Sequence, residues 1–322
     1  MSLLCFGSKE EKLPESEFDI LPRKVRMRLK FSSKKEVHEN GTTIRLGPRR
    51  ILKSGVESSE YEALRLVDRN TSIPVPKVLG VYNTREGVLV ELEVTPGKTL
   101  DAAWPSLSAQ QKRKVVDDVG RFVDQLRKIS PPRHELVGSA TMGATFDKRF
   151  GTSGRIGPFY SLDRFHEFIR RGHAVEYFKE DDSNGGSSGG ESALSITHGG
   201  RKKPYEVKFT HADLCPRNIL VDDNGRVTAI LSWESAGWYP EYWEYTQMHF
   251  ATPEAMGDWL GMMENVMARY EAEVKAEELL RHRYAGRDYD EERSIKAPSI
   301  SSSELRREQQ EIDDKNTENT SG

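Results

Sequence analysis

The apolar residues of this chain change their spacing at Pro96-Gly97. Before that point, short apolar runs bounded by turn residues are typical of β-strands, and one stretch has helical periodicity. The expected strands are 42–46, 50–53, 77–82 and 87–94, and the expected helix is 59–70. After that point the apolar residues recur at helical spacing, most clearly over 115–126. With 322 residues the chain is long enough for two lobes, so the pattern predicts a strand-rich N-terminal third followed by a helical middle.

Two of the expected helices begin with the sequence of a capping box, in which Ser and a Glu or Gln three residues later satisfy each other's backbone N–H groups. These pairs are Ser59 with Glu62 and Ser108 with Gln111. Further helices are expected over 161–178 and within 253–284, where apolar residues again follow helical spacing.

Three segments are expected to lie outside the packed body. Residues 1–35 are charged and irregular; an amphipathic segment lying on the body is the alternative, but a solvated N-terminal arm is favoured. Residues 181–203 include the Ser- and Gly-rich run 183–190 and are expected to form a flexible insertion. Residues 288–322 carry almost no apolar side chains and are expected to be a disordered tail.

Composition narrows the function classes. The formal net charge of −3 and the pI of about 6.3 give no basic surface for nucleic acid. No apolar run approaches the length of a membrane span, and the N-terminal residues lack the basic region of a secretory signal, so no membrane partner is expected. Cys5 and Cys215 are the two cysteines, and their positions argue against a structural disulfide, which indicates a reducing, cytoplasmic location.

The segment 210–222 carries most of the functional information. It contains His211 and Asp213, then Asn218 five residues after the aspartate, and strands are expected on both sides at 206–210 and 219–222. A further strand is expected at 227–231, joined to the previous one by a hairpin turn at Asp223-Asn224-Gly225. This spacing suits phosphoryl transfer, in which a carboxylate meets the attacking hydroxyl and an amide oxygen binds Mg²⁺. We therefore interpret Asp213 as the group that orients or deprotonates a hydroxyl, Asn218 as a metal ligand, and His211 as a structural residue.

A phosphate-binding lysine and its acidic partner are also needed for this chemistry. Lys53 ends an apolar strand and is the candidate lysine, although on pattern alone a surface lysine is the simpler interpretation. Glu60 in the following helix is its candidate partner, and Glu62 is the rival whose expected capping box already explains it. The aromatic residues between 233 and 245 could line a ligand, but packing below the loop is the favoured interpretation of most of them.

With these residues in view, the chain resembles the aminoglycoside phosphotransferase family, in the branch common in fungi, which has a protein-kinase-like fold. The resemblance rests on 60–65, 73–80, 96–100 with Trp104-Pro105, 157–159 and above all 210–244, and it spans roughly residues 40 to 285. It implies an α+β, bilobal fold: an N-lobe at 36–94 with an antiparallel sheet and one helix, and a larger, mainly helical C-lobe at 95–287.

The resemblance also implies roles for single residues. Lys53 would contact the phosphates of ATP with Glu60 as its partner, and the backbone of Glu93 and Val94 would contact the adenine. Asp213 would be the catalytic aspartate and Asn218 a Mg²⁺ ligand. The acceptor would be a hydroxyl of a small molecule, and we expect a monomer.

The chain departs from the family pattern at the metal. Ser232 stands where the family has an aspartate that holds Mg²⁺ on the phosphates, and a neutral hydroxyl is a much weaker ligand than a carboxylate. Glu234 could reach a metal through water, although a structural role is favoured. The Gly-rich loop over ATP is reduced to Gly41 and Gly47, and Ala212 replaces the usual glycine, a mild change.

Two functions therefore remain open. The first is an ATP-dependent small-molecule phosphotransferase whose metal site is weakened by Ser232. The second is a pseudokinase that binds a ligand or partner without turnover, which Ser232 supports directly. A purely structural module fits worst, because it leaves Lys53, Asp213 and Asn218 unexplained.

Overall fold

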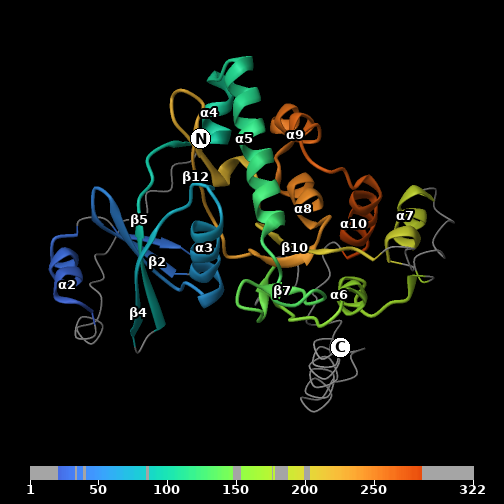
Figure 1. The fold of residues 1–322 in the computed structure, drawn as a ribbon, viewed down its shortest axis with the longest axis horizontal. Helices are drawn as coiled ribbons and strands as arrows, with labels where there is room; N and C mark the ends of the chain where they lie inside the picture. The colour runs from blue at the N-terminus through green and yellow to red at the C-terminus, as the bar shows by residue number, and fades with distance from the viewer. Residues whose placement is uncertain are drawn as a thin grey trace, which may run out of the picture.

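The computed structural model describes residues 21–32, 35–38, 41–84, 87–147, 154–175, 177, 188–198 and 204–284. An antiparallel sheet lies at one end of the molecule, and a larger, mostly helical part makes up the rest (Figure 1). The tail 288–322 and much of the segments 1–35 and 181–203 lie outside the described residues.

The N-terminal sheet has five strands in the order β1-β2-β3-β5-β4. Their bounds are β1 Lys35–His38, β2 Gly41–Gly47, β3 Arg50–Ser54, β4 Val78–Thr84 and β5 Gly87–Glu93. The strands expected from the sequence are confirmed, and β1 is an addition to them. Because side chains alternate between the faces of a strand, Leu52 and Leu89 face one side of the sheet and Lys53 and Val90 face the other.

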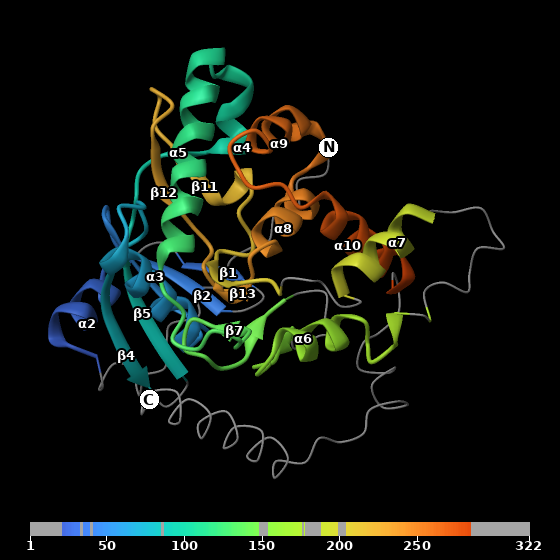
Figure 2. The same ribbon diagram turned by 45° about the vertical axis from the view of Figure 1, so that its right-hand side comes forward.

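Helix α3 (Ser58–Asn70) covers the Lys53 side of the sheet and buries Ala63, Leu64 and Val67 (Figure 2). The predicted capping box at its start is wrong, because the N-cap residue is Glu57 and Ser59 lies already inside the helix. Glu62 instead pairs with Arg65 on the same helix, with 2.7 Å between Oε1 and Nη1.

Helix α2 (Arg23–Lys30) lies on the opposite face of the sheet (Figure 1). Leu21, Val25 and Leu29 are buried there, at a spacing of four residues that puts them on one side of a helix. The expectation of a solvated arm is therefore wrong for this stretch. Its many charges obscured a short apolar stripe, and the alternative, an amphipathic segment on the body, describes it correctly.

A buried carboxylate fixes this helix to the sheet. Glu91, in β5, accepts hydrogen bonds from Arg50 at 2.8 Å, Arg28 at 3.3 Å and the Tyr82 hydroxyl at 2.8 Å, and its side chain is 4% exposed. Burial and the hydrogen bond to Glu91 raise the pKa of Tyr82 to about 12.

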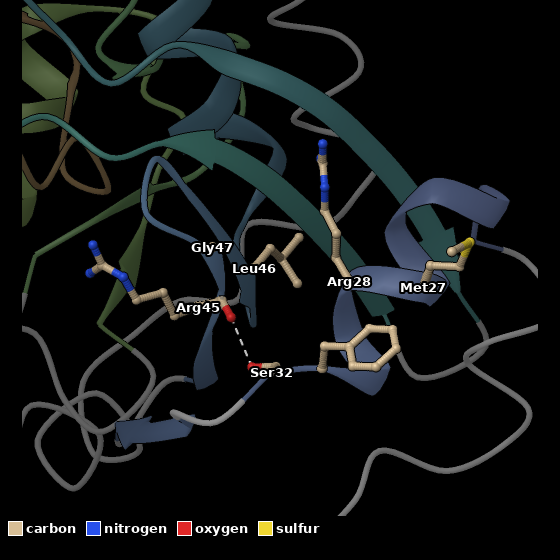
Figure 3. Close-up of a pocket in the computed structure, with 7 residues that line it drawn as sticks. Met27, Arg28, Ser32, Arg45, Leu46 and Gly47 are labelled. Carbon is tan, nitrogen blue, oxygen red and sulfur yellow. Dashed lines mark hydrogen bonds between the residues drawn. The ribbon is translucent and has the colours of Figure 1, made fainter.

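An open pocket of about 560 Å³ adjoins α2 and β2 (Figure 3). Arg28, Met27, Phe31 and Leu46 contribute to its lining, and the Ser32 hydroxyl closes one side by donating to the Arg45 carbonyl at 2.8 Å. Leu46 belongs to the apolar cluster under α2, so this pocket lies on the face of the sheet away from Lys53.

The helical part is built around α5 (Ala109–Lys128), whose N-terminus has the predicted capping box of Ser108 and Gln111. Figures 1 and 2 show α5 upright, across the long axis of the molecule, with most of the other helices of this part on one side of it. These are α4 Leu100–Ala103, α6 Leu162–Ile169, α7 Ser188–His198, α8 Trp243–Ala251, α9 Gly257–Met263 and α10 Glu271–Tyr284, with single 3-10 turns at Trp104–Ser106, Pro216–Asn218 and Glu254–Met256. The expected helix 161–178 is shorter than predicted, since left-handed residues Arg171 and Gly172 follow α6.

Two small sheets carry the loop that the sequence singles out. One has the order β10-β13-β7, with β10 Val207–Thr210, β13 Gly237–Pro240 and β7 Gly138–Ser139. The other has the order β12-β11-β6, with β12 Val227–Ile230, β11 Ile219–Val221 and β6 Lys98–Thr99. The predicted turn between β11 and β12 is confirmed: Asp222 accepts from the N–H groups of Asn224 and Arg226, and Gly225 has a φ of 68°.

The strands β10 and β11 therefore deliver the two ends of the loop 211–218. The segment that leads from β5 into the helical part also touches this region, because the Thr228 hydroxyl donates to the Pro96 carbonyl at 2.8 Å. Gly97 has a φ of 152°, and a Cβ there would come within 2.7 Å of that hydroxyl, so a larger residue does not fit.

Helix α7 corrects the expectation of a flexible insertion over 188–198. Ala193, Leu194 and Thr197 are buried at helical spacing, and α7 packs against α10 through Ala276 and Leu280. The Gly- and Ser-rich composition before these residues hid the apolar stripe. Figures 1 and 2 both show α7 beside α10, at the end of the molecule away from the sheet.

The large aromatic residues after β12 form the core, as expected. Each is at most 1% exposed: Trp233, Trp238, Tyr239, Tyr242, Trp243 and Tyr245. Within the described ranges, no helix combines the length and the apolarity that crossing a bilayer requires.

Candidate functional site

Lys53 and Glu60 form an ion pair between strand β3 and helix α3. The distance between Nζ and Oε1 is 2.7 Å, and the side chains are 33% and 9% exposed. Burial raises the pKa of the Glu60 carboxyl, and the neighbouring Lys53 opposes this shift. The pair fixes the lysine near the end of the central strand β3, with its ammonium still partly open to solvent.

The loop after β10 is held by a buried carboxylate. Glu244, at the start of α8, accepts hydrogen bonds from the N–H groups of His211 at 2.7 Å and Ala212 at 3.1 Å. Burial raises the pKa of Glu244, and the nearby His211 opposes this. Ala212 has a φ of 65°, a left-handed conformation that glycine adopts more easily than alanine. The backbone at Ala212 thus has the conformation that suits glycine, the residue expected here from the resemblance.

His211 is a structural residue in this arrangement. Its Nδ1 accepts from the N–H of Asp213 at 3.2 Å, which leaves Nε2 to donate to the Leu231 carbonyl at 2.8 Å. Both ring nitrogens are used by the backbone, and the ring packs edge-on against Trp233 with centroids 4.5 Å apart. The imidazole therefore ties the loop to Leu231, the residue before Ser232.

Asp213 is held through both carboxylate oxygens. Arg217 contacts Oδ1 at 2.5 Å, and the amide nitrogen of Asn218 contacts Oδ2 at 2.9 Å. The Asp213 side chain is 21% exposed, so the carboxylate is fixed and still accessible. This geometry suits a carboxylate that receives a proton from a hydroxyl at one defined place.

Asn218 and Ser232 lie next to one another through Leu231. The Leu231 N–H donates to the Asn218 carbonyl at 2.8 Å, and the amide nitrogen of Asn218 also donates to the Asp213 carbonyl at 2.8 Å. The amide oxygen of Asn218 is thus turned away from Asp213. Ser232 has a φ of 63°, a left-handed conformation that is costly for serine.

Glu234 belongs to the same electrostatic site. Its charge contributes to the raised pKa of Glu60 and to the raised pKa of Arg217. For Arg217, burial acts in the lowering direction, and the surrounding anions, among them Asp213 and Glu234, outweigh it. The structure therefore brings residues of the N-terminal sheet, the loop and the segment after β12 into one charged group.

Glu93 and Val94 lie where β5 leaves the sheet. Their N–H groups donate to the carbonyls of Lys77 at 2.9 Å and Arg49 at 3.0 Å. A base lying against this segment would therefore meet carbonyl oxygens, or N–H groups beyond Val94, rather than the two N–H groups at 93 and 94.

The donor set does not match a tightly held Mg²⁺. Asn218 and Ser232 are both neutral, and both oxygens of Asp213 are already engaged by Arg217 and Asn218. Glu234 is the nearest carboxylate along the chain to Ser232. Across the described ranges, no group of three or more His, Cys, Asp or Glu residues could hold a metal ion.

Sequence reasoning missed two residues of this site. Arg217 had a readable signal, because it follows Asp213 by four residues within the same loop. Glu244 had none, since it lies 33 positions after His211 and only the fold brings the two together.

Comparison with known proteins identifies the family to which this chain belongs. The sequence profile of the phosphotransferase enzyme family matches residues 54–289. The chain belongs to the phosphotransferase enzyme family. Among curated protein sequences there is no significant match.

Solved structures of family members share the fold. The GDP complex of a point mutant of aminoglycoside 2'-phosphotransferase-IIIa has a TM-score of 0.53 at 10% identity, covering 90% of this chain and 93% of that one. The streptomycin-ATP-APH(2")-IIa ternary complex has a TM-score of 0.52 at 11% identity, covering 88% and 98%. The GDP complex of the wild-type aminoglycoside 2'-phosphotransferase-IIIa has a TM-score of 0.51 at 11% identity, covering 82% and 91%. At these identities the likeness establishes the α+β, kinase-like fold of this phosphotransferase-family chain.

Proposed function

We propose that this protein binds a nucleoside triphosphate, ATP in the simplest case, and transfers its terminal phosphoryl group to a hydroxyl of a small molecule. The nucleotide lies between the N-terminal sheet and the loop 211–218. Lys53 contacts its phosphates, Glu60 holds the lysine, and the chain near Glu93 and Val94 borders the base. The acceptor hydroxyl approaches Asp213.

The observation that carries this proposal is the paired arrangement of Lys53 with Glu60 and of Asp213 with Asn218. A module without a nucleotide would have no use for a half-buried lysine fixed by a buried acid. Desolvation of Glu60 disfavours its charge, so the pair is retained at a cost that a ligand on Lys53 would justify.

The transfer step is a direct displacement. The acceptor oxygen forms a bond to the terminal phosphorus as the bond from that phosphorus to the bridging oxygen breaks, and the diphosphate leaves with the electron pair. The hydroxyl proton passes to Asp213. Asn218 keeps that carboxylate in place, and Lys53 neutralises charge on the phosphates.

Nucleotide binding tests the first half of the proposal. Lys53→Met should weaken ATP and ADP binding by about tenfold or more, because a charge-assisted contact to phosphate contributes roughly 1.5–3 kcal/mol. Lys112→Met is the matched control: Lys112 is 23% exposed and pairs with Asp258 at 3.1 Å on the surface of the helical part. Equal affinities in all three proteins would refute the assignment of Lys53.

Transfer itself is tested at Asp213. Asp213→Asn should keep nucleotide affinity within about threefold while lowering the rate of phosphoryl transfer by about a hundredfold or more, the usual range for a general base. Release of ADP in the presence of hydroxyl compounds, followed by phosphorus NMR, measures it. A variant as fast as the wild type would remove Asp213 from the chemistry.

A pseudokinase is the second candidate, and Ser232 is the observation that favours it. It predicts nucleotide or partner binding without turnover of any acceptor, even at high protein concentration. Assays of ADP release from ATP over a panel of hydroxyl compounds separate the two candidates, because an enzyme turns over an acceptor and a pseudokinase turns over none.

We also propose a cytoplasmic, monomeric protein. The buried free thiol of Cys215 supports a reducing location. Size-exclusion chromatography with light scattering would test the oligomeric state.

A further inference from the structure

Arg217 is a cation held in a fixed position beside Asp213, and it has no role in the transfer step described above. Arg217 leaves the 3-10 turn Pro216–Asn218 and reaches back over one turn to Asp213, with 2.5 Å between Nη2 and Oδ1. Its second terminal nitrogen, Nη1, donates to the Ala251 carbonyl at 3.0 Å, at the end of α8. The guanidinium is therefore held from two sides.

Arg217 is nevertheless open to a ligand. Its side chain is 48% exposed, and a guanidinium has five N–H donors, of which these two contacts use two. Because Asp213 is where hydroxyl and phosphate must meet, donors beside that carboxylate lie close to the phosphoryl group in transfer.

The charges of the site show why such a cation matters. Lys53 is shared with Glu60, and Asp213 and Glu234 add negative charge. A triphosphate brings further negative charge, and the residue at position 232 is neutral. Without a strongly held metal ion, Arg217 is the remaining cation among the residues described at this site.

We propose that Arg217 is a catalytic residue: it binds the terminal phosphate and supplies the positive charge that a metal held at position 232 would otherwise supply. Nucleotide binding by this protein then depends little on divalent metal. A guanidinium suits this task, because it keeps its charge at all relevant pH values and pairs with two phosphate oxygens at once. This inference rests on the proposed function.

The proposal separates ATP from ADP. The contact is to the terminal phosphate of the triphosphate, so ADP lacks it, whereas Lys53 serves both nucleotides. A structural i,i+4 pair between Arg217 and Asp213 would affect neither nucleotide selectively. The ratio of the two affinities is therefore a measurement that a merely structural role would not change.

The experiment is calorimetric titration of ATP and ADP into the full-length protein in EDTA and in MgCl₂. For the wild type we expect ATP affinities in the two buffers within about threefold of each other. Arg217→Gln should weaken ATP binding by about tenfold or more, equal to 1.4 kcal/mol, and change ADP binding by less than about threefold. Arg217→Lys, which keeps the charge but not the fork, should lie in between.

A control variant tests whether the loss of any one positive charge would have the same effect. Arg121→Gln removes an exposed arginine, 66% accessible, that pairs with Asp118 along α5, and it should change neither affinity. Thermal melting confirms folding of each variant. If Arg217→Gln does not fold, the selective loss for ATP must be seen in Arg217→Lys, and its absence there counts against the proposal.

Three outcomes overturn the inference. If Arg217→Gln changes the ATP and ADP affinities equally, or changes neither, Arg217 is a structural residue. The proposed function would then still be supported if Lys53→Met weakens nucleotide binding. Tightening of wild-type ATP binding by Mg²⁺ of more than about tenfold, lost in Glu234→Gln, would assign the charge to a metal on Glu234 instead. Failure of the wild type to bind either nucleotide would overturn the proposed function together with this inference.

Discussion

Replacing Ser232 by aspartate tests how charge is distributed in this site. The substitution puts a carboxylate next to Asn218, where Leu231 is clamped by the Asn218 carbonyl and the His211 ring. We expect Ser232→Asp to make ATP binding depend on Mg²⁺, because the site then offers the charged oxygen donor that Mg²⁺ prefers.

The magnitude follows from the charges of the carboxylate and the ion. At an effective dielectric constant of about 20, a carboxylate roughly 4 Å from a divalent ion gains about 8 kcal/mol. Dehydration of the ion offsets most of this gain, because Mg²⁺ gives up its bound water reluctantly. A net gain of about 1.4 to 3 kcal/mol corresponds to about tenfold to a hundredfold in affinity.

Ser232→Asn is the matched control. Asparagine has the size of aspartate and, like it, tolerates the left-handed backbone at a φ of 63°, but it carries no charge. The difference between the two variants therefore isolates the carboxylate from any relief of backbone strain.

ATP titrations of both variants, with MgCl₂ and with EDTA, provide the assay. The expected result is a Mg²⁺-dependent gain of about tenfold to a hundredfold in Ser232→Asp and less than about threefold in Ser232→Asn. If the two variants respond equally to Mg²⁺, position 232 does not face the phosphates, and the reasoning from Asn218 and Ser232 is refuted.

Three further perturbations test other parts of the structure. Ala212→Gly should raise the free energy of unfolding in urea by about 1 kcal/mol, since glycine accepts the left-handed backbone. Ala236→Gly, in a buried site without a positive φ, should lower it. Changes of the same sign in the two variants would contradict this reasoning. Glu91→Gln should destabilise the protein by about 1.5–3 kcal/mol, because the partly exposed Arg28 and Arg50 and the Tyr82 hydroxyl lose their charged acceptor. The same variant should lower the pKa of Tyr82 from about 12 toward 10.0 in spectrophotometric titration, and an unchanged titration would contradict the link to Glu91. Burial and the nearby carboxylate raise the pKa of Cys215 to about 12, so peptide mapping should find it unreactive to iodoacetamide at pH 8 until urea unfolds the protein, and rapid native labelling would oppose this.

The sequence was most informative where a feature is local. The strands of the N-terminal sheet, the capping box at Ser108 and the turn at 222–226 each depend on residues within a few positions of one another. Glu60 rather than Glu62 pairs with Lys53, but the expected capping box that led to this choice is absent, since Glu62 pairs with Arg65.

The failures share a different cause. Helices α2 and α7 each bury only a short apolar stripe, and in both the surrounding composition, charged in one and Gly- and Ser-rich in the other, outweighs it. Such a stripe becomes visible only when the partner surface is known, here the outer face of the sheet for α2 and helix α10 for α7. The role of Glu244 could not be predicted for the same reason, because the two N–H groups that it binds, those of His211 and Ala212, lie far from it in the sequence.

The backbone of the site adds an argument against a purely structural module. Ala212 and Ser232 are both left-handed, and each such residue costs about 1 kcal/mol or more. Hydrogen bonds hold both residues in this conformation. The Ala212 N–H donates to Glu244, and Leu231, which precedes Ser232, is held by the Asn218 carbonyl and the His211 ring. A module with no ligand would gain stability from glycine at either position and lose nothing.

Ser232→Gly therefore distinguishes relief of backbone strain from a role of position 232 in nucleotide binding. If the site is only structural, this variant is more stable than the wild type and no property other than stability changes. If position 232 borders the phosphates, the variant is likewise more stable, but its ATP affinity changes relative to ADP while that of Ala212→Gly does not. The comparison asks whether the strained backbone at 232 serves a ligand, independently of whether any metal is bound there.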